Sequence, residues 1–332
     1  MISPPAPRPR RAFWRTPGRR PAALARLSVR AMACRFEVAL PVERLDRRVA
    51  VQAALQEATR LDERWSVFRP DSLLAAVNRQ AHERPVPVDA ELAALLALCT
   101  RLHEDTGGAF DITTTPLSRA WRLLERAGEV PEPEALSQAR ACVGMAHVEL
   151  GRSGDAGPTV RFRRPGVELN LGAIGKGYAV DRIAVRLRAA GATPALVSAA
   201  GSSIAAAGAP PDGWLIALRG GPETPRLRLR AGAVGTTGTA EQGFTAGGVR
   251  YGHVLDPRTG EPARGMTRVT VVADTAAEAD ALSTAFFIGG PDLAARVIAR
   301  HPHTLAILQP DGSAVPRIMG DHPGVTLEAT CT

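Results

Sequence analysis

The stretch LNLGAIGKGYAVDR, residues 169–182, joins a predicted strand to a predicted helix through a glycine-rich turn. It contains Lys176, the only lysine among the 41 basic residues of the chain. Gly172, Gly175 and Gly177 allow another group to approach the backbone closely, and the helix after them offers its N-terminal amides to an anion. A glycine turn with a surface lysine fits these residues equally well, so the stretch alone leaves both interpretations open.

A nucleotide-binding P-loop does not fit this position. That motif needs a glycine five positions before the Gly-Lys pair and a Ser or Thr directly after it, which close the phosphate cradle and hold magnesium. Asn170 and Gly177 occupy those two positions instead. The motif therefore fails at both ends.

The elements around this stretch predict an α+β fold. Helical patterns occupy residues 46–65 (with Asp46 as the expected cap), 71–80, 88–106 and 116–127, and strand patterns occupy residues 160–171, 195–207, 268–274 and 304–310. Because helices and strands come in blocks rather than in strict alternation, we expect mixed β-sheets flanked by helices instead of a doubly wound sheet. We assign them to a single domain over residues 28–320.

The positive charge of the chain is confined to its beginning. Residues 1–30 contain eight arginines and no acid, which accounts for the whole net charge of +8. Residues 31–332 have equal numbers of positive and negative charges and lack the basic face with interleaved aromatics typical of nucleic-acid binding. We therefore expect no specific nucleic-acid partner. Residues 1–27, rich in proline and arginine, are expected to form a disordered tail. It is a solvated extension, the product of a misassigned start site, or a segment that binds anionic polymers or lipids.

No apolar run in the sequence reaches the length of a membrane span or of a secretory signal. We therefore expect no transmembrane segment and a cytoplasmic location. A misassigned start site would leave a periplasmic or membrane-associated location open.

Asp280 and Thr284 form the first candidate site. They lie four residues apart in ADALSTAFF (279–287), so on the predicted helix their oxygens share one face. A carboxylate and a hydroxyl suit a hard divalent cation whose other ligands are carbonyls, waters and phosphate. The same spacing is also common on solvated helix faces.

Two further segments contain candidate groups. His253 ends a predicted strand in YGHVLDPRTGEP (251–262), where it can transfer a proton or serve a structural role. Phe110 and Asp111 follow a glycine break and can clamp a planar heterocycle, or cap a helix and fill the core. A comparable setting is absent for the remaining histidines: His82, His103, His147, His301, His303 and His322.

Taken together, the segments resemble the ApbE family, the FAD:protein FMN transferases, from about residue 28 to 310. The matching motifs, in chain order, are MAC (32–34), WSVFRPDSLLAAVN (65–78), GGAFDITTTPL (107–117), LNLGAIGKGYAVD (169–181), TTG (236–238), HVLDPRTGEP (253–262) and ADALSTAFF (279–287). The resemblance implies a Mg²⁺-dependent enzyme that cleaves FAD. Such an enzyme attaches FMN through a phosphoester to a Thr or Ser of an acceptor flavoprotein and releases AMP. Some members hydrolyse FAD to FMN and AMP instead.

The resemblance also implies roles for individual residues. The FAD site would be lined by Met32, Phe68, Ala109, Phe110, Asp111, Asn170, Lys176 and Val254. Mg²⁺ would be held by the Ala173 carbonyl, Asp280 and Thr284. Lys176 and His253 are the catalytic candidates: Lys176 presents a compact charge near the pyrophosphate, and His253 helps deprotonate the acceptor hydroxyl or orients the phosphoryl group.

The sequence departs from the family pattern at two acid positions. Asn170 replaces the aspartate of Leu-Asp-Leu, and AGSS (200–203) replaces Gly-Gly-Asp, with Ser202 or Ser203 near the expected acid. These changes favour, as the rival hypothesis, an FAD-binding protein with only FAD pyrophosphatase activity or none.

Overall fold

The computed structural model describes residues 23–152, 154, 157–219, 223–239 and 243–328. Its centre is an eight-stranded sheet in the order β1-β2-β6-β7-β10-β13-β14-β15, with every neighbouring pair antiparallel. The strands are β1 (Leu24–Ala31), β2 (Cys34–Pro41), β6 (Ala195–Ala199), β7 (Ser203–Ala207), β10 (Ala233–Gly238), β13 (Met266–Ala273), β14 (Leu305–Pro310) and β15 (Arg317–Gly320).

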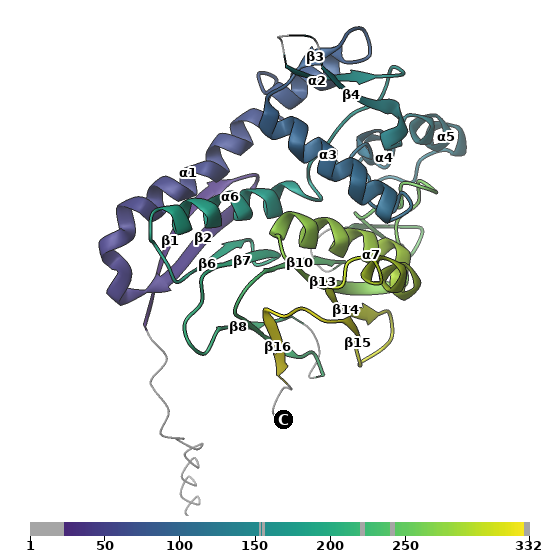
Figure 1. The fold of residues 1–332 in the computed structure, drawn as a ribbon. Coiled ribbons are helices and arrows are strands. Elements are labelled where there is room, and N and C mark those ends of the chain that lie inside the picture. Colours follow the sequence, from purple (N-terminus) through teal and green to yellow (C-terminus); the bar gives the residue numbers. More distant parts are fainter. Residues whose placement is uncertain (1–22, 153, 155–156, 220–222, 240–242, 329–332) are drawn as a thin grey trace, which may run out of the picture.

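Helices cover one face of this sheet (Figure 1). Against it pack α1 (Arg48–Trp65), α6 (Gly175–Ala189) and α7 (Ala276–Ile298), which contact β1, β6–β7 and β10–β13 respectively. The other helical segments are η1 (Val42–Arg47), α2 (Leu73–Gln80), α3 (Ala90–Asp105), α4 (Thr115–Ala120), α5 (Pro133–Ala141) and η2 (Met145–His147).

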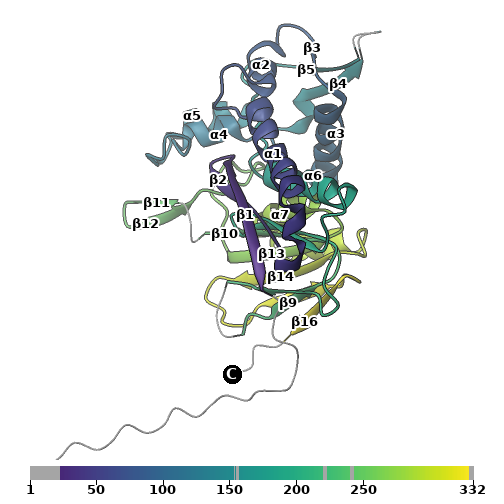
Figure 2. The same ribbon diagram turned by 90° about the vertical axis from the view of Figure 1, so that its left-hand side faces the viewer.

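Three small antiparallel sheets complete the fold. They are β16 (Val325–Glu328) with β9 (Arg226–Leu229) and β8 (Trp214–Ala217), β3 (Val86–Pro87) with β5 (Pro158–Phe162) and β4 (Val148–Arg152), and β11 (Gly243–Ala246) with β12 (Val249–Gly252). The first packs on the sheet face opposite α7, where Trp214 and Leu229 bury Ile204 and Val234. The β11–β12 ribbon projects from the body (Figure 2).

Two glycines place α7 close to its neighbours. A Cβ on Gly177 of α6 would lie 2.1 Å from the carbonyl oxygen of Ala276, and one on Gly235 of β10 would lie 2.3 Å from the carbonyl carbon of Ala279. Since real side chains do not pack at such distances, only glycine lets α6 and β10 touch the first turns of α7. The position of α7 is therefore set from both sides.

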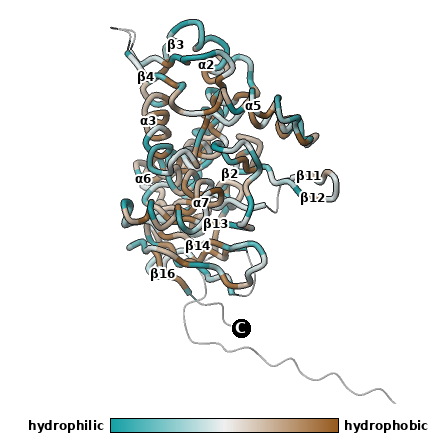
Figure 3. The backbone as a smooth tube through the Cα atoms, turned by 90° about the vertical axis from the view of Figure 1, so that its right-hand side faces the viewer, coloured by the Kyte–Doolittle hydropathy of each residue, from teal (hydrophilic) through white to brown (hydrophobic). Residues whose placement is uncertain are grey.

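Helix α7 is also the most apolar long helix of the described residues. By length and composition it could cross a membrane, but half of its most apolar window is buried within the fold. Ala281, Ala285 and Phe286 belong to the main core, and hydrophobic residues gather around α7 and β13 in Figure 3. This burial is what a central core helix requires. It gives no support for a membrane span.

The α+β expectation is confirmed, while several predicted boundaries are wrong. Strand β1 begins at Leu24, inside the segment assigned to the tail, and residues 1–22 lie outside the described part. Asp46 lies within η1, so α1 begins at Arg48 with Arg47 as its N-cap. The strand predicted over 160–171 ends at Phe162, and the helix predicted over 116–127 ends at Ala120, because turns follow both.

Candidate active site

A cavity of about 800 Å³ opens beside the start of α7. Its wall comes from the β1–β2 turn, the loop after α3, the start of α6, the end of β10, the segment after β12, and α7 itself. Segments distant in the sequence thus share one site, which is large enough for a nucleotide-sized ligand.

The start of α7 is held by Asp181 of α6. Its two carboxylate oxygens accept the backbone N–H groups of Ala276 (2.8 Å) and Ala277 (2.9 Å). The Thr275 hydroxyl accepts the N–H of Glu278 at 3.2 Å. Burial raises the pKa of Asp181 to about 6, although these backbone hydrogen bonds act in the opposite direction. Three of the otherwise unpaired amides at the helix start are thereby satisfied.

Asp280 is the centre of the polar contacts in the cavity. Its Oδ1 accepts the hydroxyl hydrogen of Ser203 at 2.8 Å, and its Oδ2 accepts the backbone N–H of Gly177 at 3.0 Å. The Nζ atom of Lys176 lies 3.6 Å from the same Oδ2. Because the carboxylate is only 5% exposed, these contacts compensate for the loss of water around it.

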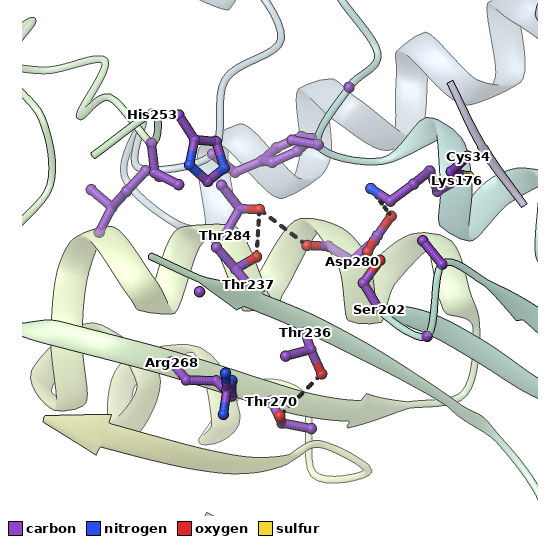
Figure 4. Close-up of a pocket in the computed structure, with 18 of the residues that line it drawn as sticks. Cys34, Lys176, Ser202, Thr236, Thr237, His253, Arg268, Thr270, Asp280 and Thr284 are labelled. Atoms are coloured by element: carbon purple, nitrogen blue, oxygen red, sulfur yellow. Dashed lines mark hydrogen bonds and ion pairs between the residues drawn. The ribbon is translucent and has the colours of Figure 1, made fainter. Parts of the chain in front are cut away.

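Thr284 lies one turn further along the same face of α7. Its hydroxyl is 3.1 Å from the Thr237 hydroxyl and 3.3 Å from the backbone oxygen of Asp280. Figure 4 shows Lys176, Asp280, Thr237 and Thr284 on the α7 side of β10, with Thr236 and Thr270 on the other side. The sequence prediction that Asp280 and Thr284 share a face of one helix is confirmed.

The oxygen atoms that line the cavity are suitable ligands for a hard divalent cation. The Ala173 segment, Asp280 and Thr284 line the same cavity and offer a carbonyl, a carboxylate and a hydroxyl. No group of three His, Cys, Asp or Glu side chains placed to hold a metal occurs in the described part of the chain. Because Asp280 is the one carboxylate among these three groups, such a cation needs further ligands from water and substrate phosphate.

The residues expected at the flavin nucleotide mostly meet at this cavity. Met32, Ala109, Phe110, Asp111, Asn170, Lys176 and Val254 all line it. Phe68 is the exception: its side chain is 72% exposed and does not line the cavity wall.

The Asn170 side chain forms a local turn. Its Oδ1 accepts the backbone N–H of Gly172 at 2.8 Å, and its backbone N–H donates to the oxygen of Ile112 at 2.7 Å. An aspartate could form the same turn, since the contact uses only an acceptor oxygen. The replacement therefore removes a charge from the cavity without changing this part of the backbone.

Two turns place further residues in the cavity wall. Met32 and Ala33 form a two-residue β-hairpin turn with φ of 48° and 55°, a left-handed conformation that usually favours glycine or asparagine. After α3, Gly107 and Gly108 also have positive φ, at 58° and 79°. That turn directs Phe110 from the end of the helix toward the cavity.

His253 lines the cavity directly after β12. The ribbon before it is held by Phe244 and Tyr251, whose rings stack at 5.2 Å, and by Trp121, whose ring lies 5.5 Å from that of Tyr251. Trp121 also donates from Nε1 to the backbone oxygen of Gly260 at 2.9 Å. These contacts fix the segment that carries the histidine.

Sequence reasoning missed the contacts of two side chains that support the site. Ser203 is fully buried against Asp280, and His103 lies beside Asp111. No local pattern identifies these contacts, because the partners lie on other elements. Thr237 belongs to the TTG motif, and its hydroxyl bonds to that of Thr284.

Comparison with known proteins agrees with this geometry. The family model described as the ApbE family matches residues 32–308. The chain belongs to the ApbE family. The resemblance seen in the motifs is thereby confirmed.

Relatives of this ApbE-family chain are named as transferases. It is 35% identical over 273 residues to the FAD:protein FMN transferase of Treponema pallidum, covering 76% of this chain and 75% of the relative. It is 30% identical to the protein of the same name from Klebsiella pneumoniae, covering 76% and 73%. The expected enzyme class, a transferase, is confirmed by these relatives.

Solved structures share the fold. The ApbE protein of Thermotoga maritima has a TM-score of 0.79 at 29% identity, covering 90% of this chain and 97% of its own. The apo form of the flavinyl transferase ApbE of Pseudomonas stutzeri has a TM-score of 0.75 at 28% identity, covering 90% and 95%.

Proposed function

We propose that this ApbE-family chain is a Mg²⁺-dependent FAD:protein FMN transferase. It cleaves the FAD pyrophosphate, transfers FMN to a Thr or Ser hydroxyl of an acceptor flavoprotein, and releases AMP. The observation that carries the proposal is the meeting of Lys176, Asp280 and Thr284 in one nucleotide-sized cavity. Curated relatives with the same printed activity support the choice of substrate.

The reaction exchanges the phosphoanhydride bond of FAD for a phosphoester bond to the acceptor. The acceptor oxygen bonds to the FMN phosphorus, the bond from that phosphorus to the bridging oxygen breaks, and AMP leaves with the bridging oxygen. The hydroxyl proton must be removed as the new bond forms. His253, at the cavity wall, is the group that we assign to accept this proton or to orient the phosphoryl group.

Charge on the two phosphates has to be neutralised while the bond breaks. Lys176 supplies a compact positive charge from the first turn of α6, whose N-terminal amides also favour an anion. Mg²⁺, bound through the Ala173 carbonyl, Asp280 and Thr284, would supply further positive charge at the phosphates. Asn170 and Asp111 are the polar groups that we assign to the flavin nucleotide.

A second candidate activity is hydrolysis of FAD to FMN and AMP, with water in place of the acceptor hydroxyl. It is favoured by Asn170, because the neutral amide removes a charge expected near the nucleotide while the groups around the phosphates are kept.

The test is incubation with FAD and Mg²⁺, with and without a peptide that carries a candidate acceptor threonine. AMP release together with a gain on the peptide of the mass of FMN less one water would support the transferase. AMP without labelled peptide would favour the hydrolase, and absence of both products would contradict both activities.

The variant His253→Ala is expected to lower labelling at unchanged FAD affinity. Labelling at the parent rate would remove His253 from the chemistry.

A further inference from the structure

One oxygen of the Asp111 carboxylate is firmly held at the cavity wall. Oδ1 accepts both the backbone N–H of Thr113 at 2.7 Å and its hydroxyl hydrogen at 2.5 Å. The Thr113 hydroxyl in turn accepts the backbone N–H of Gly144 at 2.7 Å. The carboxylate side chain is only 1% exposed. Its orientation then depends on what faces the second oxygen.

His103 faces that second oxygen from the last turn of α3. Its Nδ1 lies 3.1 Å from Oδ2 of Asp111 and 3.1 Å from the backbone oxygen of Phe110. Both neighbours are acceptors, so Nδ1 must carry the hydrogen. The ring is 23% exposed and lies behind the cavity wall rather than on it.

The surroundings favour the charged form of His103. Burial opposes protonation, but the adjacent Asp111 carboxylate outweighs it, with help from the Phe110 carbonyl and Glu104, and the pKa of His103 is raised. The C-terminal end of α3 acts in the same direction. Arg258 and the His103 ring both lie beside Gly108: a Cβ added there would be 3.8 Å from Arg258 and 3.5 Å from the ring. The charge of Arg258 is paired with that of Asp256.

We propose that His103 is a positioning residue of the FAD site: it holds the Asp111 carboxylate in place at the cavity wall and thereby sets the affinity for FAD. The inference rests on the proposed function, since Asp111 is assigned to the flavin nucleotide there. Among the described residues, Oδ2 of Asp111 is buried and accepts no hydrogen bond, since Nδ1 of His103 donates to the Phe110 carbonyl. What faces this oxygen is the charge of the protonated His103 ring, 3.1 Å away, and this ion pair favours a single orientation of the carboxylate.

The test is a double-mutant cycle on FAD binding, with the dissociation constant measured from flavin fluorescence. His103→Leu is expected to weaken FAD binding about tenfold, because it leaves the buried Asp111 carboxylate without the positive charge that faces Oδ2. In the Asp111→Asn background the same change is expected to weaken it less than about twofold, because the carboxylate that His103 positions is gone. Equal losses in both backgrounds, or no loss in the parent, would overturn the proposal.

A matched control separates positioning from general damage. His301 makes an imidazole–carboxylate contact of the same length, from Nε2 to Oδ2 of Asp105 at 3.1 Å, and does not line the cavity. His301→Leu is expected to leave FAD affinity unchanged. If it weakened binding as much as His103→Leu does, the effect of His103 would be structural and the proposal wrong.

The pH dependence of FAD binding gives a second readout. In the parent, FAD binding should weaken as the pH rises and His103 loses its proton and its charge. His103→Asn has no charge to lose, so it should bind FAD as weakly as His103→Leu and without this pH dependence. The same pH dependence in the parent and in His103→Asn would contradict the proposal.

The outcome also separates this inference from the proposed function. If the parent binds FAD and releases AMP but the double-mutant cycle shows no coupling between His103 and Asp111, only the role proposed for His103 is wrong. A parent that binds no FAD would overturn both.

Discussion

The Nζ atom of Lys176 lies 3.6 Å from Oδ2 of Asp280, so the only lysine of the chain faces the carboxylate expected to bind a cation. The two residues come from different helices that touch through Gly177. This contact lets one small volume hold a positive side chain and a metal-binding oxygen side by side. Both are needed where two phosphates must be neutralised.

Replacement of Lys176 tests the need for a compact charge. Lys176→Arg is expected to lower kcat/KM for FAD about tenfold, and Lys176→Met about a hundredfold, because the guanidinium is bulkier and differently directed and Met has no charge. The measurement is AMP release at saturating Mg²⁺. Full transfer and unchanged FAD affinity in Lys176→Arg would show that lysine has no special role.

Removal of the Ser203 hydroxyl tests how Asp280 is oriented. Ser203→Ala leaves Oδ1 of Asp280 without its 2.8 Å donor and is expected to raise the Mg²⁺ concentration for half-maximal activity about tenfold. Ser198→Ala on the adjacent strand β6 is the control, since Ser198 contacts the backbone of Gly201 and does not line the cavity. An equal Mg²⁺ requirement in Ser203→Ala and the parent would contradict this role.

A methyl group on Gly177 tests the close packing of α6 on α7. Gly177→Ala would bring Cβ to 2.1 Å from the Ala276 oxygen, and we expect a loss of about 3 kcal/mol in the free energy of unfolding. Gly175→Ala is the matched control: its Cβ would make an ordinary contact at 3.5 Å with Leu171. Thermal or urea unfolding compares the two variants. Similar stability of both would show that the helices adjust at no cost.

The pH dependence of stability tests the burial of Asp181. Its folded pKa of about 6 lies above the ordinary pKa of an aspartate, so the folded state binds the proton more tightly. Its contribution is therefore fully present below the ordinary pKa and is lost as the pH rises through about 6. Relative to Asp181→Asn, the parent should lose about 2 kcal/mol of unfolding free energy between about pH 4 and about pH 7. A constant difference between the two proteins over this range would contradict the shift.

The sequence predicted the residues of the site better than the side chains that hold those residues in place. Asp280 and Thr284 were paired correctly because a helix brings residues four apart onto one face, a purely local rule. Phe68 was assigned to the cavity from a motif, but the structure leaves it exposed, since the fold around a residue decides where its side chain points. The strand predicted over residues 160–171 is too long, since β5 ends at Phe162, because alternation of apolar residues also occurs in turns.

By itself the sequence determined the α+β class, the ApbE resemblance and eleven of the residues that line the cavity, because these depend on local periodicity and on ordered motifs. Only the tertiary structure decided which side chains support them. Ser203 reaches Asp280 across 77 positions, and Asp181 reaches the start of α7 across 95. His103 meets Asp111 only because two glycines with positive φ turn the chain back at the end of α3. Such contacts arise when elements pack together, and no spacing rule along one element encodes them.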